Sequence, residues 1–428
     1  MAETLASQHP IAPDAPMSGV DSAWLRMDNP TNRMIITSLM VFETPIGLEA
    51  LRALLYERLA SYDRFRQAAI ENPRVIGKPT WVENDFRIED HVVPAELDAP
   101  ADEATLKALV GAVMARPLDP TKPLWHMLYI ENLQDAGCVV VSRVHHCIGD
   151  GMALIKVMLD IADAMPDDAI PGAVGARKQS GHTASLGALA KAGRAAAIGG
   201  KSVGALTRLL AMPSDPSTPY KGKLGVFKTA TWSDNLPLDE VKRVGRALGG
   251  TVNDVLLTMV ADAMRRDLLR RGASLPDDGR FDLKALIPVN LRPPKANDQL
   301  GNRFGLVFLD LPVGVSGTVE RLRELKRRMD VIKRSPEAFV IFSLLSIFGH
   351  TTPRIEAAAV NLFSQKATGV MTNVPGPRVP ISIAGATVRD LMFWVPISGG
   401  LGVGLSILSY RGSVRIGLAT DAGLVPDP

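Results

Sequence analysis

The alternation of apolar and polar residues predicts a chain of many short strands and helices. Short apolar or alternating runs favour strands, and apolar residues three and four positions apart favour helices. Strands are expected at 34–42, 79–82, 91–93, 125–130, 138–144, 225–232, 283–288, 304–311, 369–373, 393–397, 404–410 and 413–419. Helices are expected at 48–61, 104–115, 152–164, 252–271, 318–333 and 338–347. Strands and helices mix in both halves, which predicts a two-domain α/β protein with a cleft between the domains.

Two of these elements carry a more specific signal. The run Val139-Val140-Val141 indicates that the strand at 138–144 is buried on both faces. Thr251 and Asp254 stand three residues apart at the start of the long helix, the spacing of a capping box.

The middle of the chain differs in composition from both flanks. Residues 169–214 include no acidic residue and are rich in Ala, Gly and Ser. We therefore expect an N-terminal domain at 1–168, a basic Ala/Gly-rich linker at 169–222 and a C-terminal domain at 223–428. The linker is either a solvated connection or contains a basic helix that rests on an anionic membrane. The sequence leaves both interpretations open.

Composition excludes several classes of protein. The chain has 428 residues, 46% of them hydrophobic and 22% charged, which excludes a disordered or collagen-like protein. A net charge of +3 gives no argument for nucleic-acid binding. Cys138 and Cys147 are too few for a disulfide framework and suit a reducing compartment. Residues 1–16 lack the apolar core of a signal peptide, and none is expected.

The longest uncharged run, at 391–410, has the length of a membrane-spanning helix. It contains Pro396 and four glycines, which break helices, so it is interpreted as two strands joined by a Gly-rich turn. The uncharged run at 338–353 is too short to span a bilayer, and it predicts a buried or lipid-facing helix.

The clearest chemical signal is His145-His146-Cys147-Ile148-Gly149-Asp150-Gly151, between the buried strand and the next helix. Adjacent histidines that leave a strand diverge, so at most one points into a given pocket. Asp150 is spaced to stiffen the turn by a hydrogen bond or an ion pair, or it only caps the helix. Both histidines are equally compatible with a structural role in the core. A metal site is disfavoured, because adjacent histidines rarely bind one ion.

The HHxxxDG pattern resembles the active-site motif of CoA-dependent acyltransferases. Further blocks narrow the resemblance to the bacterial wax ester synthase/diacylglycerol acyltransferase family over nearly the whole chain. These blocks are Asp21-Ser22-Ala23-Trp24, Pro123-Leu124-Trp125, Asn253-Asp254, Pro288-Val289-Asn290-Leu291-Arg292 with Gly301-Asn302, Thr372-Asn373-Val374-Pro375-Gly376-Pro377 and Ser409-Tyr410-Arg411-Gly412. One departure is Asn132, where the family has a glycine; asparagine tolerates left-handed turns, so the turn is expected to survive.

The resemblance implies a chloramphenicol-acetyltransferase-like fold with the active site in a channel between the domains. It implies that His146 is the general base that deprotonates an alcohol, while His145 is a structural neighbour in the motif. Asp150 is expected to face away from the substrate and to pair with Arg292. Gly151 completes the motif.

Two residues outside the motif are candidates to position or stabilise the oxyanion, namely Asn253 and Thr372. Asn253 is also compatible with a role in capping its helix. Cys147 lacks an acidic partner at a suitable spacing, so it is expected to be packed rather than nucleophilic.

The implied reaction moves a fatty acyl group from acyl-CoA to diacylglycerol or a long-chain alcohol. Acyl-CoA is then a co-substrate, and neither a bound cofactor nor a metal is expected. The alternatives are a related transferase that uses a carrier-protein thioester or a polar alcohol, and a catalytically inactive lipid-binding protein. Acceptor preference, acyl chain length and oligomeric state are not specified by the sequence.

Water-insoluble substrates imply a cytoplasmic protein that is peripherally bound to the inner face of the membrane or to lipid inclusions. Two segments are candidates for this contact. One is 184–212, with Lys191, Arg194, Lys201 and Arg208, and the other is the apolar run at 339–348.

Overall fold

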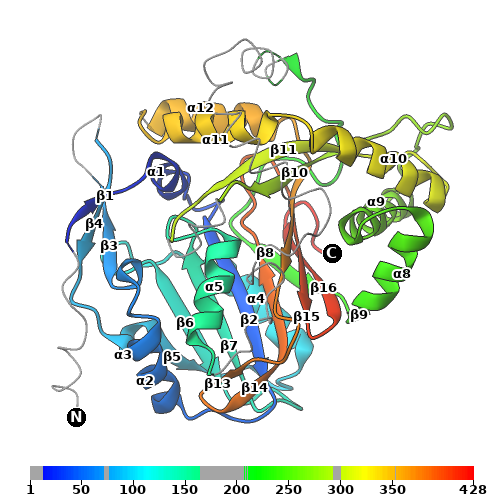
Figure 1. The fold of residues 1–428 in the computed structure, drawn as a ribbon. Coiled ribbons are helices and arrows are strands. Elements are labelled where there is room, and N and C mark those ends of the chain that lie inside the picture. The colour runs from blue at the N-terminus through cyan, green and yellow to red at the C-terminus, as the bar shows by residue number, and fades with distance from the viewer. Residues whose placement is uncertain are drawn as a thin grey trace.

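The fold is built on two large β-sheets (Figure 1), seen in a computed structural model that describes residues 13–71, 77–163, 207, 209, 211–292, 300–351 and 353–428. The first sheet has six strands in the order β13-β14-β2-β7-β6-β5. Its strands are β2 (Ile35–Phe42), β5 (Val92–Ala95), β6 (Trp125–Ile130), β7 (Cys138–His145), β13 (Ser382–Ile383) and β14 (Ala386–Trp394). The second sheet has seven, in the order β11-β10-β12-β15-β16-β8 with β9 on β16. They are β8 (Lys228–Trp232), β9 (Leu236–Pro237), β10 (Leu283–Asn290), β11 (Phe304–Leu311), β12 (Gly369–Pro375), β15 (Val403–Tyr410) and β16 (Ser413–Asp421).

Helices cover the faces of both sheets, and a small third sheet has the order β1-β4-β3. Its strands are β1 (Ala15–Pro16), β3 (Gln67–Ile70) and β4 (Thr80–Glu83). The helices of the N-terminal half are α1 (Gly19–Arg26), α2 (Leu48–Arg58), the 3-10 turn η2 (Asp63–Phe65), α3 (Ile88–His91), α4 (Glu103–Met114) and α5 (Gly151–Ile161). Those of the C-terminal half are α8 (Leu238–Leu248), α9 (Val252–Arg270), α10 (Thr318–Ile332), α11 (Glu337–Phe348) and α12 (Pro353–Ser364).

Strand β7 lies inside the first sheet, antiparallel to β2 and β6. All of its residues are buried, which confirms the two-sided burial predicted from the valine run. Val139 and Val141 pack in one apolar cluster with α4, and Val140 packs on the other face in a cluster with α5. Because helices cover both faces, an alternating polar pattern would have left buried polar groups there.

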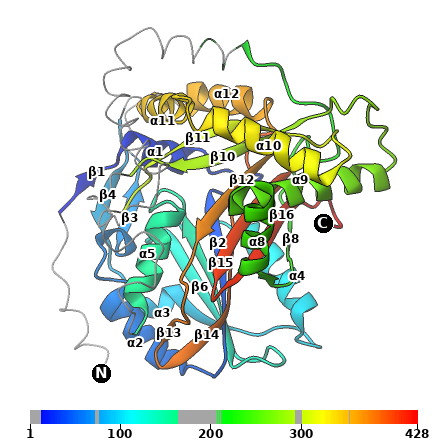
Figure 2. The ribbon, with the colours of Figure 1, turned by 45° about the vertical axis from the view of Figure 1, so that its right-hand side comes forward.

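The second sheet is also covered on both faces. Helices α8, α9 and α10 contribute to one core cluster with β10, β11, β12 and β15, and they lie together in front of these strands in Figure 2. Helix α11 packs on the other side through Val340 and Ile341, against Phe308 of β11. Helices α11 and α12 lie side by side at one end of the molecule in Figures 1 and 2.

The C-terminal part of the chain completes the first sheet. Strand β14 pairs antiparallel with β2, from Val388 opposite Phe42 to Trp394 opposite Thr37. The next strand, β15, lies in the second sheet, where it pairs with β12 and β16. The Gly-rich segment between β14 and β15 therefore connects two sheets.

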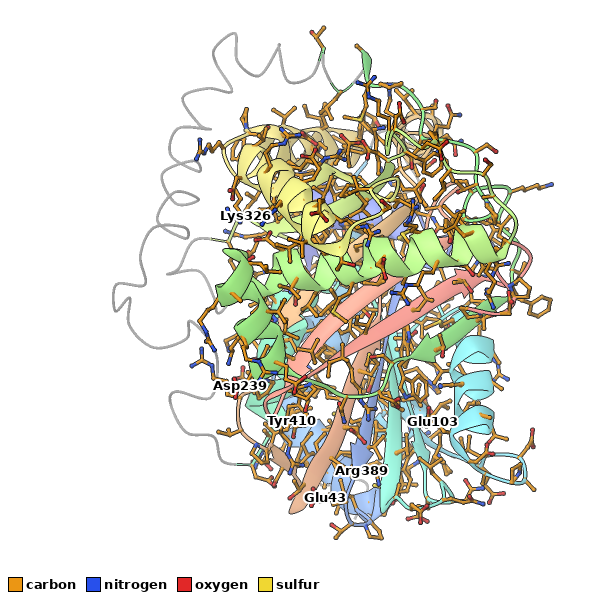
Figure 3. The ribbon with its side chains drawn as sticks, turned by 90° about the vertical axis from the view of Figure 1, so that its right-hand side faces the viewer. Glu43, Glu103, Asp239, Lys326, Arg389 and Tyr410 are labelled. Atoms are coloured by element: carbon orange, nitrogen blue, oxygen red, sulfur yellow. The ribbon has the colours of Figure 1, made fainter. Side chains whose placement is uncertain are left out.

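Side-chain contacts hold the two sheets together at the end of β15. There Tyr410 donates a hydrogen bond of 2.7 Å to the carbonyl of Val388 in β14. Figure 3 labels Tyr410 of β15 and Arg389 of β14. The first and second sheets are thus joined by hydrogen bonds as well as by the chain.

Most predicted elements are present, and the capping box at Thr251 and Asp254 is confirmed. The strand expected at 393–397 was wrong in position, because β14 begins at Ala386 and ends at Trp394. The prediction missed its first half, where Arg389 and Asp390 interrupt the apolar pattern. Helices α1, α3, α8 and α12 and the 3-10 turn η2 were not predicted, and His91, expected to begin a strand, ends α3. Asn132 is not among the residues with positive φ; its side chain instead exchanges hydrogen bonds of 3.0 and 2.9 Å with the backbone of Leu97.

Two further expectations concern membranes. Among the described residues, none of the helices combines the length and the apolar character that a bilayer span requires. The basic residues Lys191, Arg194, Lys201 and Arg208 lie outside the described residues.

Candidate active site

The HHxxxDG motif forms the turn between β7 and α5. The backbone N–H of His146 donates to the carbonyl of Met34 over 2.7 Å, which ties the turn to the start of β2. The Nδ1 atom of His145 accepts a hydrogen bond of 3.2 Å from the N–H of Cys147. Burial lowers the pKa of His145 to about 3 and raises that of the Cys147 thiol well above its usual value. His145 and Cys147 are thus neutral, buried parts of the turn.

The His146 ring is held between aromatic side chains. Trp24 of α1 stacks on it with ring centroids 4.2 Å apart and an interplanar angle of 12°. Phe304 of β11 lies 5.6 Å from it, centroid to centroid. Burial lowers the pKa of His146 below its ordinary value, opposed in part by the charges of Asp150 and Asp21 and by a hydrogen bond to Asn302. The imidazole is therefore neutral near pH 7.

A polar chain supports His146 from behind. Its Nδ1 atom is 2.8 Å from Oδ1 of Asn302, the residue that precedes Arg303 and β11. The Asn302 side-chain N–H₂ group donates to Oδ1 of Asp21 over 2.8 Å and to the carbonyl of His146 over 2.6 Å. The other oxygen of Asp21 forms an ion pair of 3.1 Å with Arg64. Three segments distant in sequence thus meet at one imidazole.

Asp150 both caps a helix and forms an ion pair. Its Oδ1 accepts from the N–H of Ala153 over 2.9 Å, which caps α5. Its Oδ2 lies 2.8 Å from Nη2 of Arg292, and it also accepts from the N–H of Arg303 over 2.9 Å. The Arg292 guanidinium donates in turn to the carbonyl of Gly301. Both interpretations that the sequence left open for Asp150 therefore hold at once.

Thr372 lies in β12, whereas Asn253 lies in α9, which packs on the opposite face of that strand. Asn253, in the first turn of α9, accepts a hydrogen bond of 3.2 Å from the side chain of Asn373. Side chains alternate along a strand, so Thr372 shares the other face with Val374. Val374 lies beside α5, because a Cβ added at Gly151 would come within 3.3 Å of it. Thr372 thus faces the half of the molecule that carries His146, whereas Asn253 is tied to the opposite face.

An apolar cavity of about 100 Å³ lies between α5 and the first sheet. Its lining begins at Val144 and Gly151, next to the motif, and continues along α5 past Met158 to Ile161. Leu391 of β14 and Leu408 of β15 also line it, so the cavity lies where the two sheets meet. Its apolar lining suits a hydrocarbon group.

Four residues of this site had no role assigned from the sequence: Asp21, Trp24, Arg64 and Asn302. Asp21, Trp24 and Asn302 belong to the sequence blocks on which the family resemblance rests. Those blocks are the signal that could have identified these three residues. Arg64 stands in none of those blocks. Among the described residues, no group of three His, Cys, Asp or Glu side chains is arranged to hold a metal ion.

Comparison with known proteins gives matches over nearly the whole chain. The wax ester synthase/diacylglycerol acyltransferase catalytic-domain family model matches residues 17–256, and the model of the C-terminal domain of the same family matches residues 300–428. A probable diacylglycerol O-acyltransferase of Mycobacterium tuberculosis is 29% identical over 436 residues, which cover 96% of this chain and 92% of that protein.

Solved structures show the same architecture. A wax ester synthase/diacylglycerol acyltransferase from Marinobacter aquaeolei VT8 superposes with a TM-score of 0.69 at 23% identity, covering 96% of this chain and 95% of that one. The first condensation domain of the calcium-dependent antibiotic synthetase, in complex with a substrate analogue, gives a TM-score of 0.62 at 14% identity, covering 96% and 91%. At these identities the likeness concerns the fold, and it confirms the predicted two-domain α/β architecture.

Proposed function

Because this chain belongs to the wax ester synthase/diacylglycerol acyltransferase family, we propose that it transfers a fatty acyl group from acyl-CoA to a hydroxyl of diacylglycerol or of a long-chain alcohol, with His146 as general base. One observation carries the proposal. A neutral, buried imidazole lies in the motif turn, whose residue Gly151 lines the apolar cavity, and its Nδ1 is hydrogen-bonded to Asn302. The other ring nitrogen, Nε2, is left to take a proton.

The reaction then follows from the chemistry of the groups. Nε2 of His146 removes the hydroxyl proton as the alcohol oxygen attacks the thioester carbonyl and a C–O bond forms. The tetrahedral intermediate collapses with cleavage of the C–S bond, the thiolate of CoA leaves, and it receives the proton from the imidazolium. The ester and free CoA thiol are the products.

The negative charge on the intermediate needs a hydrogen-bond donor. Thr372 is the better candidate, since its face of β12 is the one beside α5, and Asn253 is the second candidate. Loss of one such donor typically lowers the rate by about 10²–10³-fold. Thr372→Val, which removes the hydroxyl and keeps the shape, tests the assignment: kcat should fall while the KM for acyl-CoA stays within about twofold.

The cavity is proposed to hold the acyl chain. Ile161 lies ten positions after Gly151 in α5, and at a rise of about 1.5 Å per residue the two are about 15 Å apart along the helix axis. The wall is formed mainly by apolar side chains of α5, β2, β7 and β14, together with the hydroxyls of Ser38 and Ser142. A saturated chain in this space would leave few polar groups unpaired.

His146→Ala tests the proposal directly. Release of CoA thiol, followed by absorbance, should fall by at least about 10²-fold, the lower part of the range for a positioned base. His91→Ala is the matched control, since His91 is also buried but binds the carbonyl of Trp125 in another part of the first sheet. Near-normal turnover by His146→Ala would exclude the proposed mechanism.

A second experiment defines the acceptor. Diacylglycerol, long-chain alcohols and short alcohols are compared at one acyl-CoA concentration. Turnover with diacylglycerol or a long-chain alcohol, well above that with short alcohols, is the expected result. Activity restricted to a short polar alcohol or a carrier-protein thioester would contradict the proposed substrate class.

The enzyme is also proposed to work at a lipid surface, on the cytoplasmic face of the membrane or on lipid inclusions, because its acceptors are insoluble in water. Helix α11 supports this: Ile347 is 57% exposed, and Leu362 of the neighbouring α12 is 41% exposed. The basic segment at 184–212 is the other candidate, since an anionic surface attracts each nearby basic residue by about 1 kcal/mol.

Pelleting with anionic vesicles tests which of the two segments binds the lipid surface. If the basic segment binds, replacement of Lys191, Arg194, Lys201 and Arg208 by Gln should abolish pelleting at low salt, and high salt should release the unmodified protein. If α11 binds, pelleting should survive both treatments and be lost in Ile347→Ser. Absence of pelleting under every condition would refute the surface proposal.

A further inference from the structure

We propose that Asn302 and Asp21 are positioning residues that fix which nitrogen of His146 carries the proton. This inference rests on the proposed role of His146 as the base. An alcohol can be deprotonated only by a ring nitrogen that carries a lone pair, so the tautomer of the neutral imidazole decides whether the site works.

The first step is the orientation of the Asn302 side-chain amide. One end of this amide faces Oδ1 of Asp21 at 2.8 Å and the carbonyl oxygen of His146 at 2.6 Å. A carboxylate oxygen and a carbonyl oxygen accept hydrogen bonds and cannot donate them. The amide must therefore present its N–H₂ group to both, which turns its own oxygen toward the imidazole.

The second step is the tautomer of His146. The Asn302 oxygen lies 2.8 Å from Nδ1. Because this oxygen only accepts, Nδ1 must carry the hydrogen. A neutral imidazole has a single N–H, so Nε2 is left with its lone pair. In the opposite tautomer, Nδ1 and the amide oxygen would face each other as two acceptors, and Nε2 could not take a proton.

The third step is the support of Asp21. This carboxylate is 1% exposed, and its Oδ1 also accepts from the backbone N–H of Asn302 over 3.0 Å. Arg64 forms its ion pair with the second oxygen and donates to the carbonyls of Cys147 and Ile148, within the motif turn itself. Arg64 thus connects the carboxylate that orients Asn302 to the segment that carries His146.

The charges around the ring determine how variants should respond to pH. Two carboxylates act on the His146 ring. Asp21 is separated from the ring by the Asn302 side chain, and Asp150 is paired with Arg292. His145 precedes His146 in the turn and is neutral. The group in direct contact with Nδ1 is thus an uncharged amide. A carboxylate at that position would accept the same hydrogen but would favour the protonated imidazolium.

Three variants test the assignment. Asn302→Leu removes the hydrogen-bond acceptor but keeps a side chain of similar size. Asp21→Asn places an amide beside Asn302; because an amide can donate as well as accept, the Asn302 N–H₂ group no longer has to point toward it. Asn302→Asp, combined with Asp21→Asn, keeps an acceptor on Nδ1 and places a charge there. Asp421→Asn is the matched control, because Asp421 is a fully buried carboxylate paired with Lys228 at the end of β16.

Nitrogen-15 spectra of the histidine side chains report the tautomer without any substrate. The His146 signals are assigned by their loss in His146→Ala. We expect the Nδ1–H tautomer in the unmodified protein and in Asp421→Asn, and a mixture or the Nε2–H tautomer in Asn302→Leu and Asp21→Asn. The kcat of those two variants should fall by at least about 10-fold, since a positioned base contributes about 10²–10⁴-fold.

Asn302→Asp combined with Asp21→Asn provides the rescue, because the side-chain amide at position 21 can then donate to the second carboxylate oxygen at position 302, which would otherwise face Oδ1 of Asp21. This double variant should retain the Nδ1–H tautomer and more activity than Asn302→Leu, with the acidic limb of its kcat/KM profile moved up by about 1 pH unit or more. The positioning role is refuted if Asn302→Leu keeps both the Nδ1–H tautomer and the original pH profile. If Asp21→Asn does not fold, Asn302→Leu and the double variant decide. Full activity in His146→Ala would refute the proposed function, whereas the spectra would still report whether Asn302 fixes the tautomer.

Discussion

The Trp24 indole lies nearly parallel to the His146 imidazole, with ring centroids 4.2 Å apart and planes inclined by 12°. Phe304 lies 5.7 Å from Trp24 and 5.6 Å from His146, so the three rings form one cluster. The hydrogen bond from Nδ1 fixes one edge of the imidazole, and the indole limits tilting of its plane. His146 is thus restrained in two independent ways.

Replacement of Trp24 should therefore affect chemistry more than binding. Trp24→Phe keeps an aromatic face and should retain most activity. Trp24→Leu should lower kcat by about 10-fold or more, because small losses of alignment are costly in catalysis, with little change in KM for acyl-CoA. Trp232→Leu, in the Trp232–Trp394 pair, is the control for loss of a packed indole. A larger effect on KM than on kcat in Trp24→Leu would assign Trp24 to substrate binding instead.

The Asp150–Arg292 pair should show coupling in a double-mutant cycle. Either Asp150→Ala or Arg292→Ala leaves the partner charge buried, which costs about 3–5 kcal/mol in free energy of unfolding. The double variant should cost less than the sum of the single variants. Asp150→Asn retains an oxygen for the cap of α5 and should separate the capping contribution of about 1 kcal/mol from the ion pair. Urea denaturation gives all four values, and strict additivity would contradict a coupled pair.

Activity should persist at mildly acidic pH. Burial lowers the pKa of His146 from its ordinary value of 6.5, and the neutral ring is the active form. The midpoint of the acidic limb of the kcat/KM profile, where the ring becomes protonated, should therefore lie below pH 6.5. Thiol release from acyl-CoA, measured across pH 5 to 8 with a pH-insensitive thiol reagent, provides the profile. An acidic limb at or above pH 7 would be the contrary result.

Stability should fall in acid, and His145 should contribute to the decline. Its pKa is about 3 in the folded protein, compared with an ordinary value of 6.5, so the unfolded chain takes up a proton that the folded one does not. Its contribution is complete above pH 6.5 and is lost as pH falls toward 3, at up to about 1.4 kcal/mol per pH unit. His145→Asn, whose side-chain oxygen can accept from Cys147, should make the decline less steep. Unchanged steepness in urea titrations at several pH values would contradict this.

The acyl-chain cavity should set chain-length preference. Met158 lines it two turns along α5 from Gly151. Met158→Trp should fill the inner part and shift the preferred donor toward shorter acyl-CoA, as a lower kcat/KM for long chains with little loss for short ones. Met158→Leu is the size-matched control. Equal losses for all chain lengths would indicate that the acyl group lies elsewhere.

The sequence could predict the elements of this site better than their assembly. The valine run identified β7 as buried on both faces, and the motif placed His146 between β7 and α5, because these signals are local. The Asn302–His146 contact joins residues 156 positions apart. No periodicity encodes such a contact; only the resemblance grouped these residues as motifs. The domain limits at 168 and 223 stay predictions, since much of 164–210 lies outside the described residues.

Strand β14 illustrates the other limit. An apolar run indicates that a strand is present, but pairing with a neighbouring strand determines where it begins and ends and to which sheet it belongs. Val395 and Ile397 looked like a continuation of the strand, whereas its pairing with β2 ends at Trp394. The polar residues Arg389 and Asp390 fall within β14, at the point where its register on β2 shifts. The sequence pattern therefore placed the strand too late.

The position of β14 also constrains how the protein can be made. Strand β2 emerges from the ribosome some 350 residues before its partner β14, and until then the edge Ile35–Phe42, six of whose eight residues are apolar, has no strand on that side. Exposed apolar edges of this kind template pairing with other chains. The N-terminal half synthesised alone should therefore aggregate through this edge, and co-expression with a fragment that contains β14 should restore it to solution. Nascent chains of this protein would be expected to depend on a chaperone until synthesis is nearly complete.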